Sequence, residues 1–296
     1  MRNMFLKLGF WGRLFVFVTL TVFLMIGAVI LGDIIAYFVF GRDAIVHSDV
    51  SVVYLLQSFL AVGLFLLPPM LMVKLCCEGS LMTNLMVSKP PKALQILVSV
   101  AIVIVSAPMV SWLEDFNLRM TLPDSMASIE NWMREREDAA AQIVSKLVDS
   151  PDPMRYVLNI VVLALLPALC EEMYFRVGVQ TRLLDDKSRV MGTWSVVLTA
   201  VIFSALHLQF YGFLPRMVLG AVLGFMLMIS GNVWYSIIAH LVNNIIAVTI
   251  PFMTAKGVEM VQVQCLDTWW MALLSAAATA LMLVVMSKIE KMEKKF

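Results

Sequence analysis

Long uncharged stretches recur along the chain and predict helices that cross a membrane. A crossing needs roughly 20 apolar residues to span about 30 Å of hydrocarbon. Five stretches reach or approach that length, at residues 14–32, 50–73, 93–113, 190–215 and 268–287. The residues between Arg216 and Lys256 contain no Asp, Glu, Lys or Arg, and Gly231-Asn232 near their middle predicts a turn between two antiparallel crossings. Seven crossings follow from this pattern.

An eighth crossing has to take charged residues into the membrane. The uncharged run 156–170 makes about 22 Å of helix at ~1.5 Å per residue, which is shorter than the bilayer core. Pro151 and Pro153 block an extension on its N-terminal side. The helix therefore has to continue through Glu171 and Glu172, so that carboxylates enter the membrane.

These elements predict the fold class. We expect an all-α polytopic transmembrane bundle of about eight spans, with residues 1–296 forming a single integral membrane domain. Eight crossings place both termini on one side, and 14 of the 22 Lys and Arg residues fall on that side. By the positive-inside rule the N- and C-termini are cytoplasmic. If the chain is bacterial, this multi-pass protein lies in the plasma (inner) membrane.

The segment 114–155 is polar and is predicted to lie outside the membrane. Behind a Pro123-Asp124-Ser125 start, its apolar residues recur at helical spacing, and they are Ile129, Trp132, Met133, Ala140, Ile143, Val144, Leu147 and Val148. This spacing predicts an amphipathic helix on the outer face. The pattern favours a helix that rests on the bilayer or packs on the bundle over a gate for substrate.

Composition supports lipid as the solvent and argues against other classes of protein. With 61% hydrophobic residues, 15% charged residues and a mean hydropathy of +0.88, the chain is too apolar for a soluble globular domain. A net charge of +1 and the lack of a basic stripe argue against nucleic acid as a partner. The four cysteines have no CxxC spacing. For Cys76 and Cys77 beside Lys74, palmitoylation and plain burial both stay open.

Three polar patches within the spans are candidates for chemistry, because an ionisable residue there costs about 2.5 to 3.5 kcal/mol on insertion scales. In the first patch, EEMYFR, Glu172 and Arg176 share a helix face as an ion pair. Glu171 then points about 100° away, towards another partner. Taken alone, this patch is explained equally well by anchoring at the membrane interface.

The other two patches place histidines on uncharged spans. Phe203 and His207 in FSALH lie one turn apart, and so do His240 and Asn244 in HLVNN. A neutral imidazole in lipid needs hydrogen-bond partners for both nitrogens, so each histidine needs polar neighbours. Hydrogen bonding between helices is the alternative explanation for the third patch.

Together the three patches read EExxxR, FxxxH and HxxxN in that order. This set resembles the type II CAAX prenyl endopeptidases and their bacterial relatives, the CPBP or Abi family of intramembrane proteases. The resemblance covers roughly residues 156–251, which we expect to be the catalytic core helices, and all three motifs are complete.

The resemblance implies roles for particular residues. Glu171 would be the general base and later the proton donor, and His207 would hold the same water. His240 and Asn244 would donate hydrogen bonds to the developing oxyanion. Three residues are implied to support them, namely Glu172, Arg176 and Phe203.

The predicted function is that of an intramembrane endopeptidase acting on a membrane-associated substrate. Its partners would be a membrane protein, a peptide or a lipidated peptide, with membrane lipids around it. The sequence names neither the substrate nor the oligomeric state. No cofactor is expected, and zinc held by Glu171, His207 and His240 is the second choice. Cys170 as a thiol nucleophile is disfavoured against helix packing, and a non-catalytic immunity or scaffolding protein of the same family is the alternative from another class.

Overall fold

The computed structural model describes residues 5–184, 189–258 and 268–293, which fold almost entirely as helices. Helix makes up 86% of the structure, and the described residues contain no strand. In this part of the chain seven helices are long and apolar enough to cross a membrane, and Gly192–Ala205 is a shorter apolar helix. The prediction of an all-α polytopic bundle is confirmed.

The elements follow one another in a simple order. The α-helices are α2 (Phe10–Val46), α3 (Val50–Leu60), α4 (Leu67–Cys76), α5 (Leu81–Asn84), α6 (Ala93–Leu118), α7 (Ala127–Val148), α8 (Pro153–Asn159), α9 (Leu166–Glu172), α10 (Arg189–Ala205), α11 (Phe213–Ser230), α12 (Val233–Ala255) and α13 (Trp269–Glu293). Wider π-helical turns join some of them, at η1 (Ala61–Leu66), η3 (Ile160–Leu165) and η4 (Met173–Leu183). Short 3-10 turns precede α7 and α11, at η2 (Asp124–Met126) and η5 (Phe210–Gly212).

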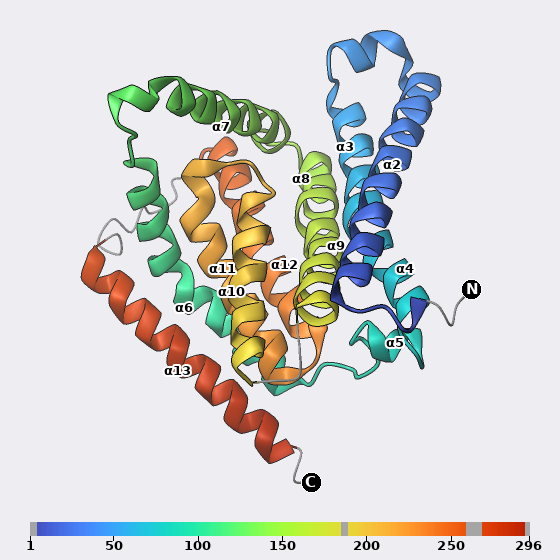
Figure 1. Cartoon of the computed structure of the whole chain (residues 1–296). Coiled ribbons are helices and arrows are strands. Elements are labelled where there is room, and N and C mark those ends of the chain that lie inside the picture. Colours follow the sequence, from blue (N-terminus) through green and yellow to red (C-terminus); the bar gives the residue numbers. More distant parts are fainter. Residues whose placement is uncertain (1–4, 185–188, 259–267, 294–296) are drawn as a thin grey trace.

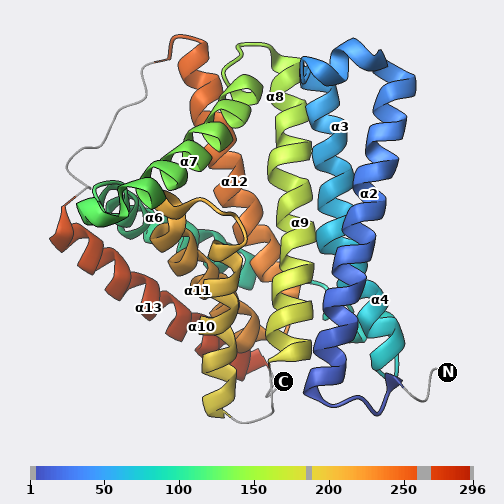
Figure 2. The same ribbon diagram turned by 45° about the horizontal axis from the view of Figure 1, so that its top comes forward.

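The bundle has two distinct ends. At one of them, here called the terminal end, α2 begins, α13 ends and the short helix α5 lies (Figure 1). At the other, the α7 end, α7 lies across the tops of the spans, and the turn between α2 and α3 lies beside it (Figures 1 and 2). The predicted amphipathic helix is present, and its predicted start coincides with η2.

Proline and glycine shape the long spans. Pro68 and Pro69 lie in the first turn of α4 directly after η1, and Pro167 lies in the first turn of α9 directly after η3. Proline has no N–H to donate, so the preceding turn loses an ordinary helical hydrogen bond and widens. Gly63 in η1 lies against α2, where a Cβ atom would stand 2.2 Å from the Cβ of Ala28. Only glycine permits this close approach.

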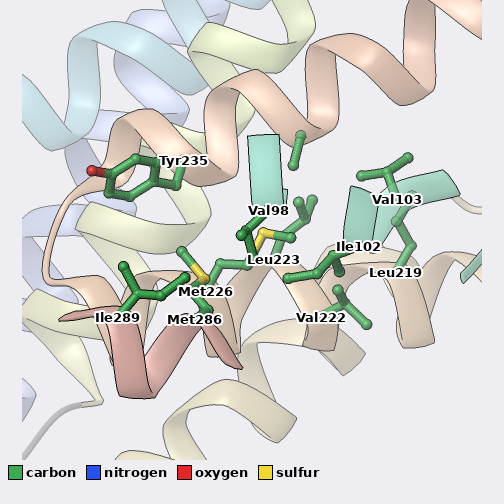
Figure 3. Packing of buried hydrophobic residues seen from close by; sticks show 11 residues of the cluster. Val98, Ile102, Val103, Leu219, Val222, Leu223, Met226, Tyr235, Met286 and Ile289 are labelled. Carbon is green, nitrogen blue, oxygen red and sulfur yellow. The ribbon is translucent and has the colours of Figure 1, made fainter. Parts of the chain in front are cut away.

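Apolar packing holds the spans on the α13 side of the bundle. The largest buried cluster joins α6, α11, α12 and α13 through interlocking aliphatic side chains and the ring of Tyr235 (Figure 3). Ile102 from α6, Leu223 from α11 and Met286 from α13 have no exposed surface. The hydroxyl of Tyr235 accepts a hydrogen bond of 3.0 Å from the backbone N–H of Lys92, which ties α12 to the start of α6.

The hairpin of α10 and α11 is shorter than the sequence predicts. The uncharged run 190–215 predicted one crossing, but α10 ends at Ala205, and its 17 residues span about 25 Å. The turn that follows lies beneath α7, and η5 contacts α7 (Figure 1). Asn117 at the end of α6 fixes this turn, because its amide donates to the carbonyl of Phe210 (3.1 Å) and accepts from the N–H of Leu214 (2.8 Å).

Contacts at the middle and at the C-terminal end of α7 fix this helix on the bundle. The carboxylate of Glu137 accepts a hydrogen bond of 3.1 Å from the N–H of Tyr211, and the guanidinium of Arg134 lies 4.5 Å from the centre of the Tyr211 ring. At the C-terminal end of α7 Leu147 is buried, and its carbonyl accepts a hydrogen bond of 2.9 Å from the side chain of Asn159. Packing on the bundle, one of the two placements favoured from the sequence, is therefore present.

Glu130 joins the start of α7 to the chain before it. Its carboxylate accepts a hydrogen bond of 2.8 Å from the N–H of Leu122 and two more from the guanidinium of Arg134. The bond from Leu122, followed by those from Arg134, lowers the pKa of Glu130 below its ordinary value of 4.5.

Candidate active site

One cavity brings the four predicted catalytic side chains together. It has a volume of about 380 Å³ and lies between η3, α9, α11 and α12, beneath α7. Glu171, His207, His240 and Asn244 all line it, although they come from three regions far apart in the sequence. Most of the remaining wall is apolar. This is the arrangement common in small-molecule and peptide sites, in which a few polar groups converge in an apolar pocket.

The carboxylate of Glu172 holds His240 in place. Nδ1 of His240 lies 3.1 Å from Oε1 of Glu172, and Nε of Arg176 donates a hydrogen bond of 2.9 Å to Oε2 of the same carboxylate. Neither Glu172 nor Arg176 has any exposed surface, and His240 is 5% exposed. The ion pair predicted between Glu172 and Arg176 is present, whereas the third member, His240, was not predicted.

This contact determines what His240 offers to the cavity. A carboxylate only accepts hydrogen bonds, so Nδ1 carries a hydrogen and Nε2 is the nitrogen left for the cavity. Nε2 donates only when the ring is protonated. The Glu172 carboxylate is the adjacent group that balances the charge of such an imidazolium.

His207 lies just beyond the end of α10. Its Nδ1 is 2.7 Å from the backbone carbonyl of Phe203. Because a carbonyl only accepts, Nδ1 carries the hydrogen, and the neutral ring presents an unprotonated Nε2. The sequence placed His207 on an uncharged span, but this placement is wrong because α10 ends at Ala205, and the hydroxyl of the nearby Ser204 donates to the carbonyl of Phe213 (2.7 Å).

The ring of Phe203 lies among the polar groups. Its centre is 5.0 Å from that of His207 and 6.1 Å from that of His240, with the rings edge to face. The guanidinium carbon of Arg176 lies 5.5 Å from the same centre. Nη1 and Nη2 of Arg176 have no hydrogen-bond partner among the described residues, so the face of the aromatic ring is a favourable contact for this cation.

Glu171 is half-buried on the cavity wall, near a cation that sequence reasoning missed. Arg216 lines the same cavity, its Nη2 donates to Oε1 of Gln209 (2.9 Å), and its charge acts on Glu171. From the sequence, Arg216 was expected only to mark the boundary of a membrane span. A lone arginine between two long uncharged runs was the available signal, since such residues in membrane proteins commonly face a polar interior.

The amide of Asn244 is oriented by its neighbour. Nδ2 of Asn243 lies 3.3 Å from Oδ1 of Asn244, so the oxygen of Asn244 is engaged and its two N–H groups are left as donors. Both side chains line the cavity. Asn243 is the second residue that the motif analysis did not single out, although it directly precedes Asn244.

Two alternatives from the sequence can be compared with the geometry. No group of three His, Cys, Asp or Glu side chains in the described ranges is close enough to hold a metal ion, so Glu171, His207 and His240 share a cavity wall without forming such a group. Cys170 has no exposed surface and is absent from the lining of the cavity. This favours helix packing over a role as nucleophile for Cys170.

Comparison with known proteins finds a match for the segment that carries most of the cavity lining. Residues 153–246 match the family model described as Type II CAAX prenyl endopeptidase Rce1-like, and all three motifs fall within this segment. No curated protein and no solved structure matches the chain. The match supports an intramembrane peptidase of the CAAX-protease type in general. Residues 153–246 are thus similar to the Rce1-like family, and the resemblance to the CAAX-protease (CPBP) family drawn from the motifs is confirmed.

Proposed function

We propose that the chain is an intramembrane endopeptidase that hydrolyses a peptide bond of a membrane-associated substrate. The observation that carries this proposal is the single cavity lined by Glu171, His207, His240 and Asn244. Peptide hydrolysis needs a base for water, donors for the oxyanion and an acid for the leaving amine. These four side chains include a group for each of these tasks.

Glu171 is the general base in this proposal, and His207 holds the water. The carboxylate takes a proton from the water as it attacks the carbonyl carbon and then delivers that proton to the leaving nitrogen. The unprotonated Nε2 of His207 accepts a hydrogen bond from the same water and orients it. Both groups lie on the wall of the cavity, where an apolar lining limits the access of bulk water.

His240 and Asn244 stabilise the oxyanion. The oxygen of the Asn244 amide is engaged by Asn243, so its N–H groups are the ones that donate to the oxyanion, and Nε2 of a protonated His240 donates as well. Glu172 supports this step because it fixes Nδ1 and balances the charge of the ring. Arg176 in turn fixes the second oxygen of Glu172.

The experiment compares cells that produce the wild type, Glu171→Gln or His207→Ala, with Cys170→Ser as the matched control next to Glu171. Protein N-termini in the membrane fraction are sequenced by mass spectrometry, and the abundance of each variant is measured. The same uncleaved precursors should accumulate in both variants and not in the control. Retained cleavage in both Glu171→Gln and His207→Ala would refute the assignment.

Metal dependence is tested separately on the purified protein, by metal analysis and by cleavage of a precursor found in that comparison. In the proposed mechanism Glu171 needs no metal to activate water, so cleavage should survive a zinc chelator. Loss of cleavage on chelation, with recovery on adding zinc, would favour the metal alternative. A phenotype in cells that persists in Glu171→Gln would favour a non-catalytic role in binding a partner.

A further inference from the structure

A line of buried polar side chains runs along the seam between η4 and α10. On η4, Arg176 and Gln180 are four residues apart, which is close to one turn. On α10, Ser195, Thr199 and Phe203 have the same spacing, so they share a helix face. The two faces meet where the guanidinium carbon of Arg176 lies 5.5 Å from the centre of the Phe203 ring. They meet again where Gln180 and Ser195 line one small cavity, so Thr199 lies between the two contacts.

Four polar atoms in this seam have no hydrogen-bond partner among the described residues. They are Nη1 and Nη2 of Arg176, Oε1 of Gln180 and Oγ1 of Thr199. The three side chains are at most 3% exposed. The amide of Gln180 is oriented, because its Nε2 donates a hydrogen bond of 3.0 Å to the carbonyl of Gly224, which leaves Oε1 as an acceptor. Buried polar groups without a partner cost free energy, so these atoms indicate a polar ligand.

The chemistry of the four atoms selects water as that ligand. Arg176 offers N–H donors, Gln180 offers an acceptor, and the hydroxyl of Thr199 can be either. An anion is disfavoured by Oε1 of Gln180 and by the carboxylate of Glu172, and a cation is disfavoured by the guanidinium of Arg176. Water both donates and accepts, and it commonly bridges buried groups of this kind. We propose that ordered water fills the seam and bridges Arg176 to Thr199 and Gln180.

The small cavity beside Gln180 provides room for several of these water molecules. It has a volume of about 120 Å³ and lies between η4, the start of α10 and the end of α11. One water needs about 10–15 Å³ of such space. At the other end of the seam, Phe203 lines the catalytic cavity whereas Arg176 does not, so the ring separates the two. The water of the seam is therefore distinct from the water that Glu171 activates.

Water in the seam completes the support of His240. The Nε of Arg176 donates to Glu172, and the same carboxylate contacts Nδ1 of His240. Bridging water supplies acceptors for the remaining N–H groups of Arg176 and so holds the guanidinium in the orientation that bonds Glu172. The inference goes beyond the proposed peptidase function and does not depend on it, because water in the seam is measured without cleavage.

A double-mutant cycle tests whether Gln180 and Thr199 hold the same water. Gln180→Leu and Thr199→Val each remove a polar atom of the seam, and the full-length protein is unfolded by heat in detergent micelles. Since either change displaces a shared water, the melting temperature of the double variant should fall by clearly less than the sum of the two single decreases.

Thr279→Val is the matched control for this cycle. Thr279 of α13 is 4% exposed, and its Oγ1 likewise has no partner in the described part of the chain. Helix α13 packs on α6 and α11. The effect of Thr279→Val should therefore add to that of Gln180→Leu. Additive effects for Thr199→Val as well would contradict a shared water.

A crystal structure grown in a lipid mesophase locates the water directly, whether or not the double variant folds. In the wild type we expect a water peak within about 3.2 Å of Nη1 or Nη2 of Arg176. A peak bonded to Oε1 of Gln180 should be present as well and should be absent in Gln180→Leu. Direct bonds between these side chains, a seam without water peaks, or bromide found there by anomalous scattering after a soak would overturn the proposal.

Discussion

Replacing Glu172 alone is expected to destabilise the fold strongly. Glu172→Gln keeps the shape of the side chain and removes its charge, which leaves the guanidinium of Arg176 buried without a bonded anion. Both residues have no exposed surface, and Nη1 and Nη2 of Arg176 have no other hydrogen-bond partner in the described part of the chain. Breaking such a buried pair costs about 3–5 kcal/mol, or roughly two to three and a half orders of magnitude in the unfolding equilibrium.

Replacing both partners should restore part of the stability without restoring activity. In Glu172→Leu/Arg176→Met no charge of the pair is left buried, and apolar replacements of buried ion pairs are commonly neutral or stabilising. Because Nδ1 of the buried His240 also loses its acceptor, which costs about 1–3 kcal/mol, we expect the double variant to be less stable than the wild type by about that amount but more stable than Glu172→Gln. Cleavage should stay abolished, because His240 has lost the carboxylate that holds Nδ1.

The assay follows unfolding in mixed micelles as the fraction of denaturing detergent rises, with tryptophan fluorescence as the signal. Asp115→Asn is the matched control, because Asp115 and Arg119 form a pair with the same spacing and side chains that are 45% and 76% exposed. It should change the free energy of unfolding by about 0.5 kcal/mol or less. The reasoning fails if Glu172→Gln is as stable as this control, or if the double variant is no more stable than Glu172→Gln.

Three further outcomes are expected. Asn244→Ala should lower kcat about 10²- to 10³-fold, the usual effect of losing one oxyanion donor. Asn243→Ala removes only a hydrogen bond that orients Asn244, so it should lower kcat less. Steady-state kinetics on an identified precursor measure both effects. Gly63→Ala should destabilise the protein by about 1–3 kcal/mol through overpacking, whereas Gly27→Ala, where a Cβ meets nothing within 4 Å, should not. The folded-state pKa of Glu130 is lowered, so the stabilisation from its carboxylate is present above pH 4.5 and is lost as the pH falls through the folded value. In Glu130→Gln the melting temperature should therefore decrease less than in the wild type when the pH is lowered from about 6 to 3.

Local spacing predicted those parts of the site that lie within a single helix. Glu172 and Arg176 are four residues apart and form the expected pair, because residues at this spacing share a helix face. Phe203 and His207 show the same relation, with their rings in contact. The short run 156–170 also indicated correctly that the crossing it begins extends past Glu171, since α8, η3, α9 and η4 form one span to Leu183.

Contacts between different helices could not be predicted from sequence spacing in the same way. His240 bonds to Glu172 rather than lying beside Asn244 alone, and these partners are 68 residues apart in the sequence. Which of two adjacent carboxylates faces a distant histidine depends on how the spans rotate against one another. The π-helical turns of η3 and η4 on either side of α9 add to that rotation, and their exact extent leaves no periodic signal in an uncharged run.

The end of α10 shows why hydropathy misplaced His207. A turn at membrane depth is tolerated only where protein or water satisfies its backbone. Here Asn117 of α6 bonds both sides of the turn, and Glu137 of α7 accepts from the N–H of Tyr211. The turn can therefore stay apolar in sequence and leave the uncharged run unbroken, while the chain reverses direction beneath α7. Helix α7 thus contributes to the site in two ways: it lines the cavity through Val144, and it covers the turn that sets the position of His207.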